Sequence, residues 1–120
     1  MRPVVTCTLT FGLLLVSCGG SPPPANYPPE IKSFDVQPDQ GTAPLAVTIN
    51  CRAQDPDGMV VEYQYDFEGD GRVDFRDRFG VTTHTYGKGG TYRATCIAVD
   101  DLGAKSRAVK EVMVQDFSLP

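Results

Sequence analysis

The sequence predicts an all-β sandwich of about seven strands between residues 30 and 116. Short runs in this part alternate apolar and polar residues, which is the two-residue period of a strand with one buried face. Clusters of Asp, Pro and Gly interrupt the runs about every ten positions. No stretch keeps a helical period long enough to compete with this pattern. At 120 residues, the chain has room for one such domain.

Each predicted strand is a run whose apolar residues fall on alternate positions. The strongest is residues 45–53, where every second residue from Leu45 onward is apolar. The same rule makes Met59, Val61, Tyr63, Tyr65 and Phe67 the lining of the next strand, and Tyr92, Ala94, Cys96 and Ala98 the inward face of a later one. The complete set of expected strands is 31–36, 45–53, 59–67, 82–86, 92–98 and 108–114.

The segments between these strands have the composition of turns and loops. Residues 37–44 are expected to form a loop, and residues 88–90 a tight turn. The segment Asp55-Pro56-Asp57-Gly58 is a turn by its chemistry. Aspartate side chains accept backbone N–H groups, proline presets φ, and glycine adopts positive φ.

The first 17 residues predict a signal peptide. Arg2 supplies a positive start, and residues 3–16 are mostly apolar but shorter than the roughly 18 residues that a membrane span needs. Leu15-Val16-Ser17-Cys18 resembles the lipobox of bacterial lipoproteins, in which the cysteine carries the lipid. Stable anchoring needs two or more acyl chains, as such proteins have. An ordinary secretory signal followed by a chance cysteine is the alternative.

This interpretation divides the chain into a signal peptide at 1–17, a lipidated cysteine and Pro/Gly-rich tether at 18–29, the domain at 30–116 and a tail at 117–120. We therefore expect an exported protein, anchored by lipid to the bacterial cell envelope. Gly19 stands where an inner-membrane retention Asp would otherwise follow the lipidated cysteine, which favours the outer membrane if the host has one.

Four segments in a fixed order identify the kind of domain. DPDG, YQYDFEGDGRVD, THTYGKGGTY and AVDDLG follow one another between Asp55 and Gly103. In this order they resemble the PKD domain, an immunoglobulin-like β-sandwich of bacterial surface proteins. The resemblance implies a non-catalytic unit that binds an unknown protein or glycan partner. It also leaves open a calcium-binding adhesin-like module, or an accessory subunit of a secreted hydrolase system.

The charge of the chain restricts its partners. The formal net charge is −4, and the acidic residues gather at turns between the expected strands. Nucleic-acid binding needs basic patches against phosphate, so this balance argues against a nucleic-acid partner.

Cys7 is expected to be removed with the signal peptide, and Cys18 is expected to carry the lipid. Two cysteines then remain in the domain. Cys51 and Cys96 lie 45 positions apart in a chain expected to be exported, where disulfides persist. A pair of buried thiols and an intermolecular bridge are the alternatives. The resemblance to immunoglobulin-like domains implies an inter-sheet disulfide between strands B and F, with Tyr65 in place of the usual Trp packed over it.

The sharpest candidate site is the acidic segment from Asp66 to Asp77. Its spacing overlays part of a calcium loop, with oxygens at alternate positions followed by a glycine. Hard cations prefer such oxygen ligands, so Ca²⁺ is the candidate ion. The alternative is a structural turn whose carboxylates accept backbone N–H groups. The candidate ligands are Asp66, Glu68, Asp70 and Asp74.

A second, weaker metal candidate comprises Asp55, Asp57, Asp100 and the neighbouring Asp101. These residues follow two expected strands that end at the same pole of a sandwich, and we expect the loop after residue 67 to lie near this pole. Some PKD-like domains attached to bacterial collagenases bind calcium with acidic loop residues and the N-terminal linker. The resemblance therefore implies a possible calcium site here as well.

The sequence offers no catalytic constellation. His84 is the single histidine, and the PKD pattern has a structural histidine at this place. Without a second histidine or a free cysteine, neither a nucleophile–base pair nor a zinc site can be assembled. Four tyrosines could stack on sugars, but two of them fall on the buried register. These tyrosines are Tyr27, Tyr63, Tyr86 and Tyr92. We therefore expect no enzyme.

Overall fold

The computed structural model describes residues 26–117, which form eight β-strands and no helix. Within this range no helix is long and apolar enough to cross a membrane. The predicted signal peptide and Cys18 lie outside the described residues. The strands are β1 (Glu30–Gln37), β2 (Gln40–Thr42), β3 (Leu45–Gln54), β4 (Val60–Asp66), β5 (Phe75–Asp77), β6 (Val81–Tyr86), β7 (Gly90–Asp100) and β8 (Lys105–Gln115).

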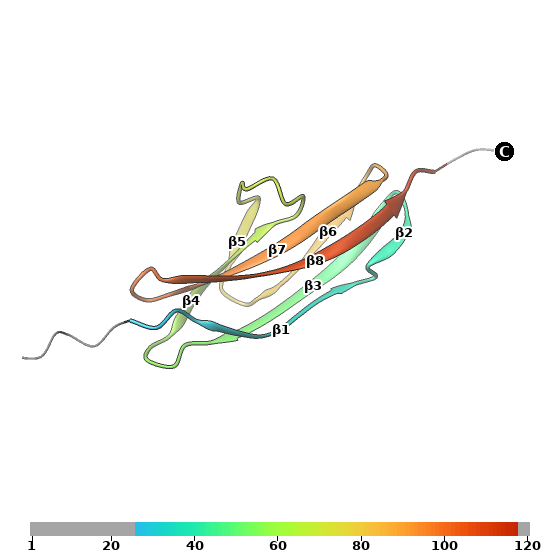
Figure 1. The fold of residues 1–120 in the computed structure, drawn as a ribbon. Helices are drawn as coiled ribbons and strands as arrows, with labels where there is room; N and C mark the ends of the chain where they lie inside the picture. Colours follow the sequence, from blue (N-terminus) through green and yellow to red (C-terminus); the bar gives the residue numbers. More distant parts are fainter. Residues whose placement is uncertain (1–25, 118–120) are drawn as a thin grey trace, which may run out of the picture.

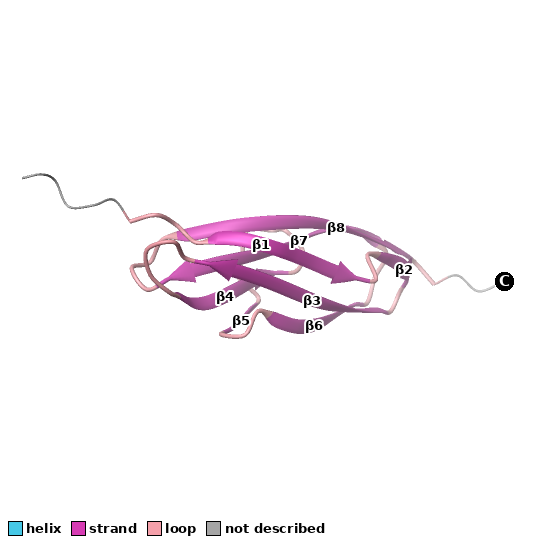
Figure 2. Ribbon diagram, turned by 90° about the horizontal axis from the view of Figure 1, so that it is seen from below, coloured by secondary structure: helices cyan, strands magenta, loops and turns pink. Residues whose placement is uncertain are grey.

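The strands form two sheets that pack face to face (Figures 1 and 2). One sheet has the order β1-β3-β6, and the other has the order β2-β8-β7-β4-β5. All neighbours are antiparallel except β2 and β8, which run parallel. The chain therefore has the predicted all-β sandwich fold.

The alternating pattern in the sequence accounts for the two faces of β3. Val47, Ile49 and Cys51 are buried, while the residues between them are exposed. The opposite sheet supplies a matching inner surface from β4, β7 and β8, including Ala94, which is fully buried. Burial of this shared apolar layer is the main stabilising contribution to a two-layer sandwich.

Tyr65 occupies the centre of the core, where the sequence predicted it in place of the usual Trp. Its side chain is 0 % exposed, and its ring stacks against Phe67 and Phe75 at centroid distances of 6.2 and 6.1 Å. The hydroxyl donates a 3.0 Å hydrogen bond to Asp77 Oδ1. Burial and this carboxylate both raise the pKa of Tyr65, so the phenol stays protonated and remains a donor.

The two cysteines of the domain face each other across the sheets. Cys51 on β3 and Cys96 on β7 are both buried, and they lie 2.6 Å apart, near the distance of a disulfide. Tyr65 pairs with Cys96 across β4 and β7, so its ring lies on the same inner face. The contact with Cys51 and burial both raise the pKa of Cys96, which keeps the reduced thiol neutral.

Four local features differ from the sequence prediction. Met59 lies before β4 and is 65 % exposed, and Val61 is also exposed. A register shift between Val60 and Glu62 changes which residue faces the core, so Val60 packs inward instead. The expected loop at 37–44 contains the short strand β2, and the acidic segment contains β5. Both are three-residue strands, too short for a period to be detected.

The relative position of the two acidic regions was also predicted wrongly. β4 and β7 are antiparallel, with Val60 opposite Asp100 and Asp66 opposite Thr95. The loop after β4 therefore points away from the end that holds Asp100. The acidic regions are separate along the sandwich and cannot form one site.

We expect the Cys51–Cys96 disulfide to stabilise the oxidised domain substantially. Closing a loop of this length reduces the entropy of the unfolded chain by an amount worth about 4 kcal/mol. Urea unfolding of the oxidised protein should therefore show a free energy of unfolding higher by up to that amount than the Cys51→Ala/Cys96→Ala variant. Reductant should remove the difference. Equal stability of the oxidised protein and the double variant would contradict the pairing.

Candidate metal centres

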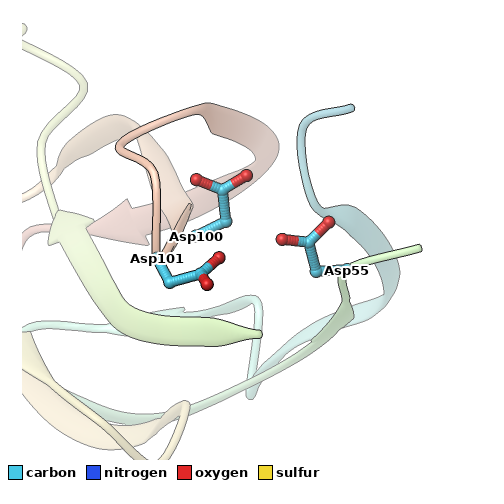
Figure 3. Close-up of side chains that lie close together, drawn as sticks. All are labelled: Asp55, Asp100 and Asp101. Atoms are coloured by element: carbon cyan, nitrogen blue, oxygen red, sulfur yellow. The ribbon is translucent and has the colours of Figure 1, made fainter. Parts of the chain in front are cut away.

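The first candidate centre lies at the end of the sandwich where the N-terminal linker joins β1, and we call it the linker-end cluster. It comprises Asp55, Asp100 and Asp101 (Figure 3). Asp55 follows β3, Asp100 ends β7, and Asp101 begins the turn to β8. One carboxylate oxygen of each lies within 4.8 Å of the others. The structure thus brings together three of the four residues predicted for this site.

Asp100 is the member of the linker-end cluster whose carboxylate accepts the most hydrogen bonds. It is 1 % exposed, and its Oδ1 accepts hydrogen bonds from the backbone N–H groups of Leu102 (3.0 Å) and Ala104 (2.7 Å). Its Oδ2 accepts a 3.0 Å bond from the side-chain amide of Asn26. Burial opposes ionisation of Asp100, but these donors outweigh it and lower its pKa. Asp100 is therefore an anion at neutral pH.

Asp55 is the member whose bonding is incomplete. Its Oδ1 accepts a 3.4 Å hydrogen bond from the N–H of Asp57, but its Oδ2 is buried and has no hydrogen-bond partner. Burial, together with Asp57 and Asp100, raises the pKa of Asp55 to about 6. A buried carboxylate oxygen without a donor is unusual in proteins, and a cation would satisfy it.

The N-terminal linker is fastened to this end by three hydrogen bonds, one of which the hydroxyl of Ser106 donates to the backbone oxygen of Pro29. The side chain of Asn26 donates to Asp100, and the backbone N–H of Tyr27 donates to Asp57 Oδ2 at 2.9 Å. Asp57 therefore belongs to the linker contact and lies outside the linker-end cluster. Asn26 was not singled out from the sequence, because a lone amide in a Pro-rich segment gives no signal of its partner.

The second candidate centre, which we call the loop cluster, comprises Asp66, Glu68 and Asp74 around the loop from β4 to β5. Asp66 accepts three backbone hydrogen bonds, from Gly69 (2.8 Å), Asp70 (3.2 Å) and Gly71 (2.8 Å). Burial alone would raise the pKa of Asp66, but these three N–H groups lower it. Asp66 therefore acts as the cap of this loop.

The other acidic residues of the loop are also used for turn chemistry. Asp74 Oδ2 accepts the N–H of Phe67 at 2.8 Å, and Asp70 Oδ1 accepts the N–H of Arg72 at 2.9 Å. Asp70 is not part of the loop cluster. Three of the four carboxylates predicted as calcium ligands, all except Glu68, are thus engaged by backbone donors, which favours the structural interpretation of this loop.

Glu68 and His84 form a weak contact beside the loop cluster. His84 Nε2 lies 3.8 Å from Glu68 Oε2. Burial and the neighbouring Asp74 raise the pKa of Glu68 to about 7, and burial lowers the pKa of His84. The His84 ring stacks on Phe67 at 4.0 Å and meets Tyr86 edge-on at 4.6 Å. These contacts support the predicted structural role of His84.

The predicted sugar-stacking tyrosines are mostly unavailable. Tyr63 and Tyr86 are buried, and the hydroxyl of Tyr86 donates to the backbone oxygen of Phe67 at 2.7 Å. Tyr92 stacks on Tyr86 at 4.3 Å. Only Tyr27 among the four is widely exposed, so these tyrosines do not form a platform of several rings.

Comparison with known proteins supports the family resemblance. The family model described as "PKD domain" matches residues 26–115. A collagenase of Bacillus cereus (strain Q1), ColQ1, is 37 % identical over 67 residues. That match covers 56 % of this chain but 6 % of the collagenase. This chain therefore spans a small part of the curated relative that it matches.

Solved structures show the same fold. A structure of carbohydrate-binding modules from the β-sandwich superfamily, solved to explain their promiscuous specificity, matches with a TM-score of 0.68 and 28 % identity. The match covers 79 % of this chain and 37 % of that chain. The PKD1 domain of Vibrio anguillarum Epp matches with a TM-score of 0.59 and 25 % identity, covering 78 % of this chain and all of that chain.

The raised pKa values of Asp55 and Glu68 predict a pH dependence of stability. A carboxyl group whose pKa is higher in the folded state stabilises the fold when protonated, and this contribution is lost as the pH rises through the folded pKa. The Glu68→Gln variant should therefore gain stability relative to the wild type as the pH rises from about 4.5 to about 7. Asp55→Asn should gain it as the pH rises from about 4 to about 6.

The difference in stability between each variant and the wild type is the quantity to measure, because the titration of His84 changes stability in the opposite direction over the same pH range. Its lowered pKa means that stability falls as the unfolded histidine becomes protonated below about pH 6.5. Urea unfolding midpoints of the wild type and of each variant, measured at several pH values, would give these differences in stability. Glu30→Gln is the control. Lys32 lowers the pKa of Glu30, so Glu30 is ionised above pH 5.5 in both the folded and the unfolded protein. A pH-independent difference for Glu68→Gln would contradict the assignment.

Proposed function

The chain belongs to the PKD domain family, and from this premise we propose that it is a non-catalytic interaction module of the bacterial cell envelope. In this proposal it is exported, held at a membrane by lipid on Cys18, and used to contact a glycan or protein outside the membrane. PKD domains are generally non-catalytic.

The observation that carries the proposal is the likeness to binding modules. The carbohydrate-binding structure matches 79 % of this chain at 28 % identity, and the matched collagenase contains this kind of domain within a far longer chain. Both relatives use the sandwich as one part of a larger protein. A function in binding or accessory contact agrees with both, whereas a catalytic function would need a constellation that the described residues lack.

The position of the linker supports a tethered arrangement. The linker is fastened at the linker-end cluster, while the C-terminal end of β8 lies at the other end of the sandwich and the loop from β4 to β5 lies between them (Figure 1). A chain anchored at Cys18 would keep the linker end nearest the membrane. The Pro-rich residues 19–29 would act as a semi-rigid spacer at about 3.1 Å per residue.

Metabolic labelling tests the anchoring. Cells expressing the full chain and fed an alkyne-tagged palmitate should incorporate the label into the wild type and not into Cys18→Ser. The wild type should also sediment with membranes and dissolve in detergent. Cys51→Ser is the matched control, which should keep the label. A wild type that is secreted without label would contradict the proposed anchoring and leave an ordinary exported domain.

Calcium binding at the linker-end cluster is the second candidate function. The observation that favours it is the buried Asp55 Oδ2 without a partner, beside the ionised Asp100. Asp55, Asp100 and Asp101 would hold the ion, which would supply positive charge between the three carboxylates. The fastened linker beside them would make the ion a stabiliser of the anchored end. The loop cluster has no comparable unsatisfied oxygen.

Thermal unfolding in calcium and in chelator tests this candidate. At a calcium concentration 100-fold above Kd, binding to the folded state alone should stabilise the domain by about 2.7 kcal/mol. Asp55→Asn should abolish the shift. Glu68→Gln, which alters the loop cluster instead, should keep it. No shift in the wild type would exclude the site, and a shift lost only in Glu68→Gln would move it to the loop cluster.

A further inference from the structure

The outer face of the five-stranded sheet carries cations in a regular arrangement. Residues directly opposite one another in a sheet share a face, so the register places Arg76, Gln64, Ile97 and Arg107 in one row across β5, β4, β7 and β8. A second row contains Glu62, Val99 and Lys105. Arg93, further along β7, lies on the same face opposite Glu111. We call these residues the five-strand face.

The charge of the five-strand face is opposite to that of the chain. The face carries four cations, the two surface carboxylates Glu62 and Glu111, and the buried Asp66 in the row between them, so its net charge is +1 in a chain of −4 and the rest of the chain carries −5. The ion pairs within residues 26–117 are Lys32–Glu30 and His84–Glu68, which leaves all four of these cations without an ion-pair partner there. One of the two carboxylates, Glu62, already accepts a 2.8 Å hydrogen bond from Gln64.

A shallow hollow of about 470 Å³ lies at the β5 side of this face. It is lined by Val61, Glu62, Arg76, Asp77 and Arg78. The carboxylate of Asp77 is already used, because its Oδ1 accepts the hydroxyl of Tyr65 and the N–H groups of Phe79 and Gly80. The exposed Arg76 and Arg78 therefore remain as free donors in the hollow.

The chemistry of the hollow favours a carboxylated sugar. A guanidinium group donates two parallel hydrogen bonds to a carboxylate, which matches its planar geometry. The exposed side chain of Val61 offers an apolar contact for a sugar ring, and Glu62 offers an acceptor for a ring hydroxyl. Arg76 in the hollow and Arg107 on β8 are three strand spacings apart, about 14 Å, with the buried Gln64 and Ile97 between them, and a linear polymer with repeated charges can span that separation.

Other polyanions fit this face less well. The two rows contain no aromatic residue, whereas protein interfaces depend on buried aromatic anchors. A nucleic acid is a long polymer of high charge density, and it would meet the strongly negative remainder of the chain on either side. A flexible polymer with one carboxylate per sugar avoids most of that repulsion.

We propose that the five-strand face binds a linear polysaccharide that contains uronic acids, with the hollow at Arg76 and Arg78 holding one carboxylated ring. This inference rests on the proposed function of an interaction module and names its ligand class. The binding is electrostatic, so it weakens as salt increases.

Affinity electrophoresis and calorimetry with polygalacturonate test the proposal on the folded, oxidised domain. The probe should retard and bind the wild type at low ionic strength, and Arg76→Glu/Arg78→Glu should weaken binding at least tenfold. Arg107→Glu should weaken it as well. Arg52→Glu is the matched control, because Arg52 is an exposed arginine on β3 in the other sheet. Unchanged circular dichroism and urea midpoints would show that each variant folds.

Three results would overturn the inference. The first is no binding of polygalacturonate by the wild type. The second is an equal loss of affinity in Arg52→Glu, which would show a general charge effect. The third is binding of polygalacturonate that is unchanged in Arg76→Glu/Arg78→Glu, which would reject this face while leaving the proposed interaction module intact.

Discussion

The contact of Tyr65 with the cysteine pair is the constraint on which the rest of this sandwich depends. Tyr65 fills the centre of the core beside Cys96, and its hydroxyl reaches Asp77 at the edge of the sheet. A buried hydroxyl needs an acceptor, since leaving it unpaired costs about 1–3 kcal/mol. The core residue that holds the two sheets together therefore also fixes the position of an edge residue.

That edge residue organises the crossing from one sheet to the other. Asp77 accepts the N–H groups of Phe79 and Gly80, and the oxygen of Gly80 accepts the N–H of Cys51 at 2.7 Å. Gly80 has φ of 78°, and a Cβ there would collide with the carbonyl oxygen of Cys51. The same short segment holds Arg76 and Arg78. The positions of Arg76 and Arg78 beside Val61 thus follow from core packing, because these contacts hold the turn in one conformation.

Sequence analysis predicted the features that follow from a pattern repeated over many residues, and it missed the features that depend on a single residue. The fold, most of the strands and the facing of Cys51 and Cys96 follow from alternation over many residues. The register shift before Glu62 reversed the expected facing of Val60 and Val61, because one inserted residue leaves no trace in a period. For the candidate sites, sequence spacing found the acidic residues of both clusters. It could not show that backbone donors satisfy Asp66 while Asp55 Oδ2 has none.

The cationic face shows why a net charge is a poor guide to partners. The balance of −4 argues against polyanions when it is read as a property of the whole chain. Strand pairing, however, collects Arg76, Arg107 and Lys105 on one surface, while many carboxylates lie in turns and loops, where backbone donors hold them. Charges more than about 10 Å apart are largely screened at 0.1 M ionic strength. A ligand lying on the five-strand face therefore meets a local net positive charge, and the loop cluster beside Arg76 and Arg93 limits how far a rigid polyanion can extend across it.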